Sequence, residues 1–351
     1  MTQNRVIKSS DKNYAISLSR VLGMIFIVLC HIIQYYSFIP GHSVLAQFFN
    51  CAVSLFIFIS GYLYGTKTIS GFKKWLVKRW FVVSMPAIIL SVGVIAVLLF
   101  AGETVSLNSA IAYLLDAEGI LFISGNVFGN LFEAIPSLDT LWFTTVIMLC
   151  YLMIPLLQKV TKKINTDFFS AFIVLSVVAG FVISLFLDKY ISLEYFVLFA
   201  LGYYLGKIKW LDSINLRIFL ICTVIFVVLL LSRVILHHYF DDSFIYLQFV
   251  AWSHQFIGVW FVIAFSFVSR KYYSLVRTIS ETSVVRLMDK YSYYVYISHG
   301  VFCMGAFNVY ENIGSLVLAT VVFAVGTIAL SFLLKTITDF FGKLLINKMK
   351  K

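Results

Sequence analysis

The sequence predicts an all-α protein, a bundle of about ten membrane-spanning helices, and three observations lead to this. Of the 351 residues, 61% are hydrophobic and only 12% are charged, whereas soluble domains carry about 25% charged residues. The apolar residues form continuous runs, and roughly 20 such residues are needed to cross about 30 Å of hydrocarbon. The runs do not alternate apolar and polar residues over about ten positions, as the strands of a membrane β-barrel do.

Ten apolar runs are the expected spans, and together they make one transmembrane domain over residues 1–351. The first eight have clear polar borders, the sixth is short, and the last two are separated only around Glu311 and Asn312. The longest segment between spans is 102–138, which we expect on the extracytoplasmic side. The expected spans are 15–36, 44–66, 80–101, 139–158, 168–187, 191–206, 216–236, 244–268, 291–310 and 313–334.

The basic residues predict the orientation of these spans. With the N-terminus in the cytosol and the spans alternating, 25 of the 27 Lys and Arg residues lie on the cytosolic side, and only Lys189 and Arg233 lie outside. Short cytosolic loops carry such an excess of positive charge, so both termini are expected in the cytosol. The net charge of +11 is then explained by a basic inner face, which we expect to contact anionic lipids. No nucleic-acid partner is expected.

The first span holds two ionisable residues on one face. Arg20 and His31 are eleven residues apart, which is about 20° past three full helical turns, and they are separated by roughly 16 Å along the axis. Ionisable residues inside a span are costly and usually functional. Two interpretations remain open: Arg20 extends to the inner interface and His31 is a buried structural residue, or His31 acts as a general base.

Other polar residues in or near the spans have the same two kinds of interpretation. His254 and His299 lie inside the eighth and ninth spans, where they either line one cavity or pack as core residues. A basic cluster enters the third span, and it serves either topology and lipid contact or the binding of phosphate; its members are Lys73, Lys74, Lys78 and Arg79. The five cysteines lie inside spans without paired spacing, so neither a disulfide framework nor a metal site is expected.

Six segments, in order, carry a recognisable set of motifs. The first is the Arg20-to-His31 spacing, and the second is the Ser-Gly-Tyr stretch within 54–63. The third is the basic segment from Lys73 to Arg79 with Pro86 behind it. The remaining three are Leu-Trp-Phe at 141–143, the Leu-Gly-Tyr-Tyr-Leu-Gly-Lys stretch within 199–207, and the tyrosine-rich segment 293–299 that ends in Ser-His. Gly300 follows that last histidine.

In this order and spacing the segments resemble the acyltransferase-3 family of membrane acyltransferases, whose members usually have ten helices and a proline at the position of Gly300. The resemblance covers almost the whole chain. It implies an enzyme of the plasma (inner) membrane that moves an acyl group, most often acetyl, from cytosolic acetyl-CoA to a hydroxyl. The acceptor implied is a sugar of a cell-surface or lipid-linked glycan.

The resemblance also implies roles for residues of this chain. His31 is expected to act as general base or as a transient acyl carrier, and Arg20 to hold a donor phosphate or carbonyl oxygen. The basic cluster is expected to bind the donor phosphates. The acceptor is expected to meet the acidic and aromatic surface around 102–142, and four residues are expected to line the cavity: Ser60, Trp142, His299 and Asp139.

Two other classes of protein remain as alternatives. A polytopic transporter or a flippase of lipid-linked glycans also needs polar residues inside spans, but the sequence shows no repeated halves. A polytopic glycosyltransferase needs acidic groups near a span end, and Asp139 and Glu133 are the candidates for that role.

Overall fold

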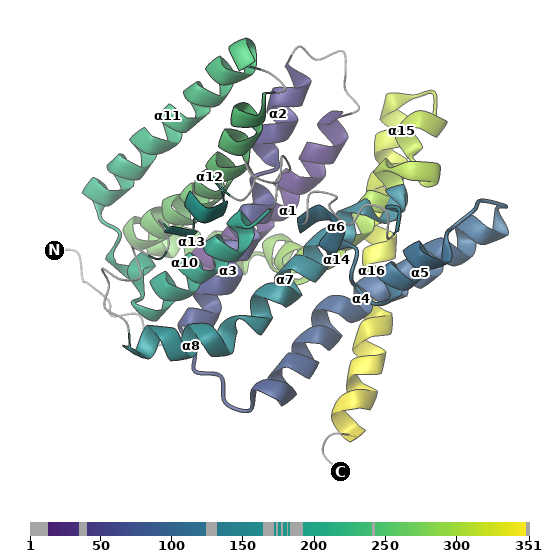
Figure 1. Ribbon diagram of the computed structural model, residues 1–351, viewed down its shortest axis with the longest axis horizontal. Helices are drawn as coiled ribbons and strands as arrows, with labels where there is room; N and C mark the ends of the chain where they lie inside the picture. Colours follow the sequence, from purple (N-terminus) through teal and green to yellow (C-terminus); the bar gives the residue numbers. More distant parts are fainter. Residues whose placement is uncertain are drawn as a thin grey trace.

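The computed structural model describes residues 13–34, 41–123, 132–163, 192–240 and 243–348, together with positions 172, 175, 176, 178–180 and 182. All regular secondary structure in these ranges is helical (Figure 1). The longer helices are α1 (Tyr14–Gln34), α3 (Ala52–Gly65), α4 (Phe72–Phe100), α7 (Trp142–Leu152), α8 (Ile154–Lys163), α10 (Glu194–Lys207), α11 (Leu216–Phe240), α12 (Phe244–Lys271), α13 (Tyr273–Glu281), α14 (Ser283–Cys303) and α16 (Leu316–Lys348). The shorter ones are α2 (His42–Phe49), α5 (Leu107–Leu114), α6 (Gly119–Ile123), η1 (Pro136–Leu141), η2 (Trp210–Ser213), η3 (Gly305–Phe307) and α15 (Val309–Asn312).

Seven helical segments among the described residues are long and apolar enough to cross a membrane. They correspond to seven of the ten expected spans: 15–36, 44–66, 80–101, 139–158, 216–236, 244–268 and 313–334. The expected span 168–187 lies largely outside the described residues. The expected span 191–206 corresponds to α10, which has only 14 residues. The total of ten spans and the sides of the termini therefore stay predictions.

The boundaries of several spans differ from those expected. The span 44–66 is two helices, α2 and α3, which meet at Asn50 and Cys51. The span expected at 291–310 is a helix that begins at Ser283 and ends at Cys303, because Met304 is extended and Gly305 has a left-handed backbone with φ of 64°. Its first half carries charged residues, which hid its true start in the hydropathy pattern.

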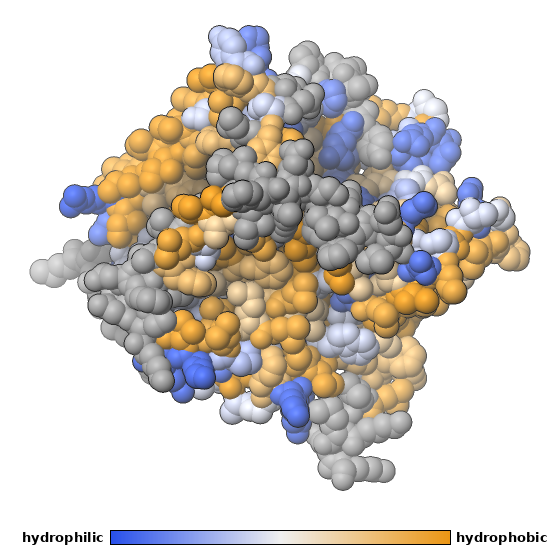
Figure 2. Space-filling view, in the orientation of Figure 1, coloured by the Kyte–Doolittle hydropathy of each residue, from blue (hydrophilic) through white to orange (hydrophobic). Residues whose placement is uncertain are grey.

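Large apolar side chains cover the outside of the protein. Helix α11 lies along one outer edge of the bundle (Figure 1) and exposes Leu220, Val224, Val228, Leu231 and Ile235. Figure 2 shows a face dominated by hydrophobic residues, with hydrophilic ones gathered mainly towards its margins. A soluble protein rarely exposes so large an apolar surface, so these faces are suited to contact lipid.

Four glycines let α3 and α10 cross at close range. Gly61 and Gly65 on α3, and Gly202 and Gly206 on α10, lie where the two backbones meet. The glycines of each pair are four positions apart, as in small-residue helix contacts in membranes. A Cβ atom at Gly65 would lie 1.9 Å from the carbonyl oxygen of Tyr203, and one at Gly206 would lie 2.1 Å from that of Tyr62. The short helix α10 is thus held against α3 by direct backbone contact.

Helices α1 and α14 run side by side in the same direction. At the start of α1, the hydroxyl of Tyr14 donates at 2.6 Å to Glu281, the last residue of α13, two positions before α14 begins. Further along, Ser17 and Arg20 contact Asp289, and near the far ends His31 contacts His299. Helix α16 packs against α14 on another side. This pair of helices carries the candidate site.

Candidate active site

Two histidines face each other near the ends of α1 and α14. The ring centroids of His31 and His299 are 5.0 Å apart, and the rings are inclined by 44°. His299 is fully buried. Its Nδ1 lies against the carbonyl oxygen of Tyr296, and since a carbonyl only accepts, Nδ1 carries the proton. The Nε2 atom of His299 has no hydrogen-bond partner among the described residues, so it presents a lone pair in the neutral ring.

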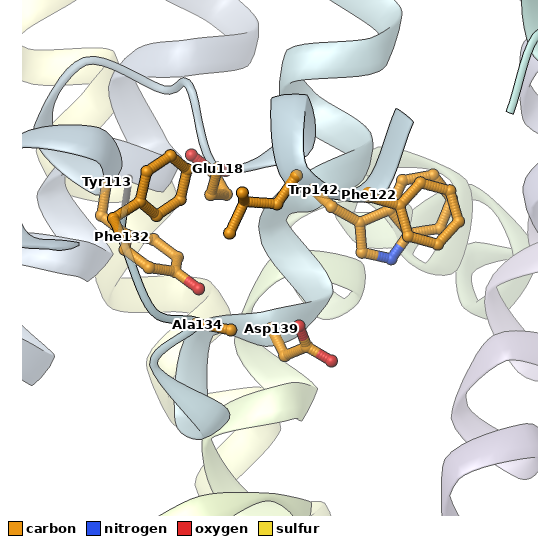
Figure 3. A pocket seen from close by; sticks show the side chains of 8 residues that line it. Tyr113, Glu118, Phe122, Phe132, Ala134, Asp139 and Trp142 are labelled. Atoms are coloured by element: carbon orange, nitrogen blue, oxygen red, sulfur yellow. The ribbon is translucent and has the colours of Figure 1, made fainter. Parts of the chain in front are cut away.

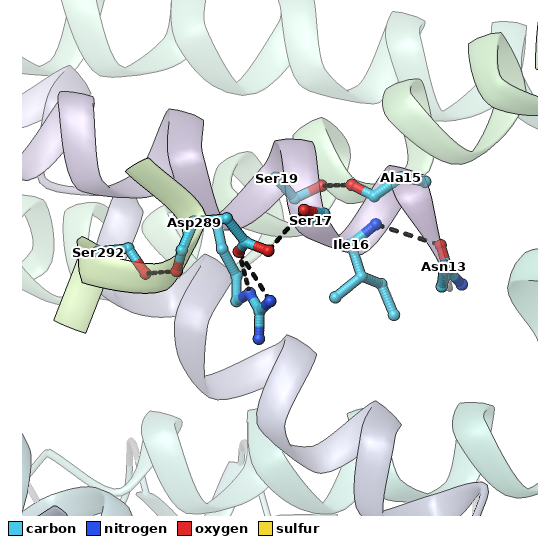
Figure 4. Close-up of polar contacts among 8 residues, drawn as sticks. Asn13, Ala15, Ile16, Ser17, Ser19, Asp289 and Ser292 are labelled. Atoms are coloured by element: carbon cyan, nitrogen blue, oxygen red, sulfur yellow. Dashed lines mark hydrogen bonds and ion pairs between the residues drawn. The ribbon is translucent and has the colours of Figure 1, made fainter. Parts of the chain in front are cut away.

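Arg20 is held by a carboxylate rather than placed beside His31. Its Nε and Nη2 atoms lie 2.9 and 2.7 Å from Oδ1 of Asp289. The hydroxyl of Ser17 donates to the other carboxylate oxygen of Asp289 at 2.7 Å, as Figure 4 shows. Sequence reasoning overlooked Asp289, although it stands ten residues before His299 much as Arg20 stands eleven before His31. Two contacts about 15 Å apart along the helices therefore join α1 to α14.

An apolar groove occupies the interval between these two contacts. Its volume is about 360 Å³, and residues of α1, α14 and α16 line it. Met24 and Val28 come from α1, Tyr291 and Val295 from α14, and Ala324 from α16. The groove thus runs from the level of the Arg20–Asp289 pair towards the level of the two imidazoles.

The basic cluster lies at the start of α4. Lys73, Lys74 and Lys78 are exposed, and the guanidinium carbon of Arg79 lies 5.5 Å from the ring centre of Tyr64. This stacking of a cation on an aromatic face is favourable.

Aromatic rings on three helices support that stacked arginine. The ring centroid of Tyr64 lies 5.1 Å from that of Trp75 and 5.1 Å from that of Tyr151. Ser60, expected to line the cavity, hydrogen-bonds Tyr151 and so belongs with this aromatic group rather than with the histidines.

The helix η1 touches α14 one turn before His299. The hydroxyl of Tyr296 donates to the carbonyl oxygen of Thr140 at 2.6 Å. A Cβ atom at Gly300 would lie 2.5 Å from Oγ1 of Thr140, so glycine at this position permits the close approach. The ring of Tyr296 is 5.9 Å from that of His299. Through Tyr296, Thr140 therefore connects the histidine pair to the segment that carries Asp139 and Trp142.

Asp139 and Trp142 line a pocket of about 280 Å³ with residues of the segment before η1 (Figure 3). Another of its lining residues, Glu118, forms with Asp116 a buried pair of carboxyl groups that sequence reasoning also missed. The Oγ1 atom of Thr144 contacts Oδ1 of Asp116 and lies 3.4 Å from Oε1 of Glu118. Burial raises the pKa of Asp116 to about 6 and raises that of Glu118 well above its usual value. The order Asp-Ala-Glu was visible in the sequence, but nothing local indicated that both acids are buried.

The other histidine considered, His254, belongs to a different cluster. Its Nε2 lies 2.6 Å from the carbonyl oxygen of Gln47 and 3.2 Å from Nη2 of the buried Arg233. No group of three or more His, Cys, Asp and Glu side chains suited to a metal ion occurs within the described ranges. All five cysteines are free thiols.

Comparison with known proteins defines the class. The model of the acyltransferase domain family matches residues 13–336, which is nearly the whole chain and includes every site residue named above. With its long apolar helices the protein is a multi-pass membrane acyltransferase. The chain belongs to the acyltransferase-3 family. No curated protein and no solved structure matches it.

Proposed function

We propose that the protein transfers an acyl group, most often acetyl, from acyl-CoA to a hydroxyl group of a cell-surface or lipid-linked glycan, in the plasma (inner) membrane. The observation that carries this proposal is the pair formed by His31 and the buried His299, in a chain of an acyltransferase family. Two apposed imidazoles, one of them with an unpartnered nitrogen, supply a proton acceptor and a group that stabilises its charged form.

In the proposed step His31 acts as general base. It removes the proton from the acceptor hydroxyl while the hydroxyl oxygen attacks the thioester carbonyl carbon. The new C–O bond forms and the C–S bond breaks, and the proton taken by His31 passes to the departing CoA thiolate. Nε2 of His299 accepts a hydrogen bond from the transient imidazolium of His31. A variant of this route has His31 carry the acyl group between two successive transfers.

The donor binds, in this proposal, with its phosphates on the exposed lysines at the start of α4 and its thioester arm along the apolar groove between α1, α14 and α16. Ammonium groups hold phosphate oxygens strongly. The Nε and Nη2 atoms of Arg20 are paired with Asp289. Its Nη1 atom is therefore the one that we assign to a phosphate or carbonyl oxygen of the acyl donor.

The donor site is tested with a triple Lys73→Gln, Lys74→Gln, Lys78→Gln variant. We expect the KM for acetyl-CoA to rise at least tenfold with little change in kcat, because the lost contacts bind the donor equally in the ground and transition states. Lys343→Gln, an exposed lysine of α16, is the matched control. Unchanged donor affinity in the triple variant would remove the phosphate role.

The activity itself is tested with membranes that contain the protein and acetyl-CoA labelled in the acetyl group. Label is expected in the glycan fraction with the wild type and with His238→Ala, an exposed histidine, and to fall by about 10²–10⁴-fold with His31→Ala. A His31→Ala protein that inserts normally and still labels the glycan rules out the assigned base. Export of glycan without any incorporation of label identifies a transporter or flippase instead.

A further inference from the structure

The pocket beside η1 has two aromatic walls with carboxylates between them. Figure 3 shows Trp142 and Phe122 on one side and Tyr113 and Phe132 on the other, with Glu118 and Asp139 in the space between. The rings of Trp142 and Phe122 are stacked, with centroids 3.8 Å apart and an interplanar angle of 15°. At about 280 Å³ the cavity lies just below the usual size range of ligand sites, which suits one ring rather than an extended chain.

Glu118 presents an unused hydrogen-bond acceptor to this pocket. The residue is only 6% exposed, and its Oε1 lies 3.4 Å from the hydroxyl of Thr144. Its Oε2 has no hydrogen-bond partner in the part of the chain that the structure describes. A buried acceptor without a donor is costly, so a ligand that brings a hydroxyl group to Oε2 removes that cost.

The charge of the pocket limits the kind of ligand. Both of its charged lining residues are acidic, Glu118 and Asp139, and no Lys or Arg is among the lining residues described. Asp116 adds a third carboxyl group behind Glu118, through their shared contact with Thr144. Carboxyl groups accept hydrogen bonds from hydroxyls, and the carboxylate of the exposed Asp139 repels carboxylate, phosphate and sulfate groups.

We propose that this pocket binds an uncharged, hydroxyl-rich sugar ring of the acceptor, packed between the aromatic walls, with Glu118 and Asp139 accepting hydrogen bonds from its hydroxyls. The inference rests on the proposed glycan acyltransfer and assigns the acceptor subsite and its chemical class. Thr140 is next to Asp139 in the chain, and its carbonyl oxygen accepts a hydrogen bond from the hydroxyl of Tyr296. The ring of Tyr296 adjoins that of His299. The pocket is thereby joined to the imidazole pair through Thr140 and Tyr296.

The test measures binding and transfer separately, on the full-length protein in detergent. The probes are maltotriose and chitotriose, which are uncharged, and trigalacturonate, which carries carboxylates. Saturation-transfer NMR is expected to detect both uncharged probes and to show trigalacturonate binding at least tenfold more weakly. Glu118→Gln, Asp139→Asn and Trp142→Leu are each expected to weaken the uncharged probes about tenfold.

The control is Glu103→Gln, which changes an exposed acid of the same segment and is expected to bind all probes as the wild type does. Acetyl-CoA binding is expected to stay unchanged in all four variants, which shows that each is folded. The inference is overturned if neither uncharged probe binds, if trigalacturonate binds as tightly, or if the pocket variants bind like the wild type. Failure of acyl transfer in the wild type with the binding pattern intact counts against the proposed function alone.

Discussion

The imidazoles of His31 and His299 lie 5.0 Å apart, centroid to centroid, on two helices that run in the same direction and are joined again at Arg20 and Asp289. The ion pair and the histidine pair are about 15 Å apart along the helix axes. The register of α1 against α14 therefore determines whether the two rings meet, because a one-residue slip would turn either ring by about 100°.

His299 is expected to support the base without contacting the donor. His299→Ala should lower kcat by about 10- to 100-fold while the KM for acetyl-CoA changes little, because the hydrogen bond it accepts forms only when His31 becomes protonated. His299→Gln, which keeps an acceptor, should recover part of the loss. Steady-state kinetics in proteoliposomes provide the measurement. Equal loss in both variants together with reduced thermal stability would show a purely structural role.

The ion pair of Arg20 and Asp289 is expected to couple energetically. We predict that Arg20→Gln and Asp289→Asn each destabilise the protein, and that the double variant loses less than the sum of the two. A coupling free energy of about 1–2 kcal/mol is expected, since Asp289 is 7% exposed while Arg20 is 38% exposed and water screens the arginine. The coupling is obtained from a double-mutant cycle, in which the melting temperatures of the wild type, the two single variants and the double variant are compared. Strict additivity would mean that the pair does not hold the two helices in register.

The groove between α1, α14 and α16 is expected to carry the thioester arm of the donor. Ala324 lines this groove, so Ala324→Trp should fill part of it and raise the KM for acetyl-CoA about tenfold or more. Ala329 is an exposed alanine of the same helix outside the groove lining, and Ala329→Trp should leave the KM unchanged. The proposed route is wrong if the two tryptophan variants behave alike.

The glycine contact between α3 and α10 is expected to be intolerant of any side chain. Gly65→Ala should cost at least about 3 kcal/mol and greatly reduce the folded yield, because the new methyl group would meet the Tyr203 carbonyl at 1.9 Å. Gly93 on α4 has no atom within 4 Å of a Cβ position, so Gly93→Ala should be neutral or slightly stabilising. Fluorescence-detected gel filtration and melting in detergent distinguish these outcomes.

The buried carboxyl group of Asp116 should make stability depend on pH. Burial raises its pKa from 3.8 to about 6, so between these values the folded chain holds a proton that the unfolded chain has released. Stability is therefore highest at the low end of this window and falls as the pH rises through about 6. Glu118, whose pKa is also raised, shifts stability in the same direction.

Removing that group should remove its share of the pH dependence. At pH 7.5, Asp116→Asn is expected to melt at a higher temperature than the wild type, with a free energy of unfolding larger by an amount on the order of 2 kcal/mol. Near pH 4.5 the two proteins should differ little. Glu103→Gln, at an exposed position, should follow the wild-type curve. A wild-type stability that rises between pH 4.5 and 7.5, with Asp116→Asn matching it throughout, contradicts the assignment.

Local sequence was sufficient to predict much of the architecture. It also predicted the α1 member of each contact with α14, Arg20 and His31. Long apolar runs predicted helices where α1, α4, α11, α12 and α16 form, because hydrophobicity and length act within one segment. The spacing of Arg20 and His31 placed both on one face of the first helix, and both side chains reach α14. The start of α14 at Ser283 was missed, because Arg286, Asp289 and Lys290 interrupt its apolar pattern.

The sequence by itself determined that this chain is a helical membrane protein with ionisable residues on one face of its first span, and its motifs identified the family. Only the tertiary structure decided which residues meet: Asp289 with Arg20, His299 with His31, and Asp116 with Glu118 and Thr144. The physical reason is that hydropathy and helical periodicity are properties of a few neighbouring residues. Partners far apart in the chain meet only through packing such as the glycine crossing of α3 and α10 and the parallel register of α1 and α14.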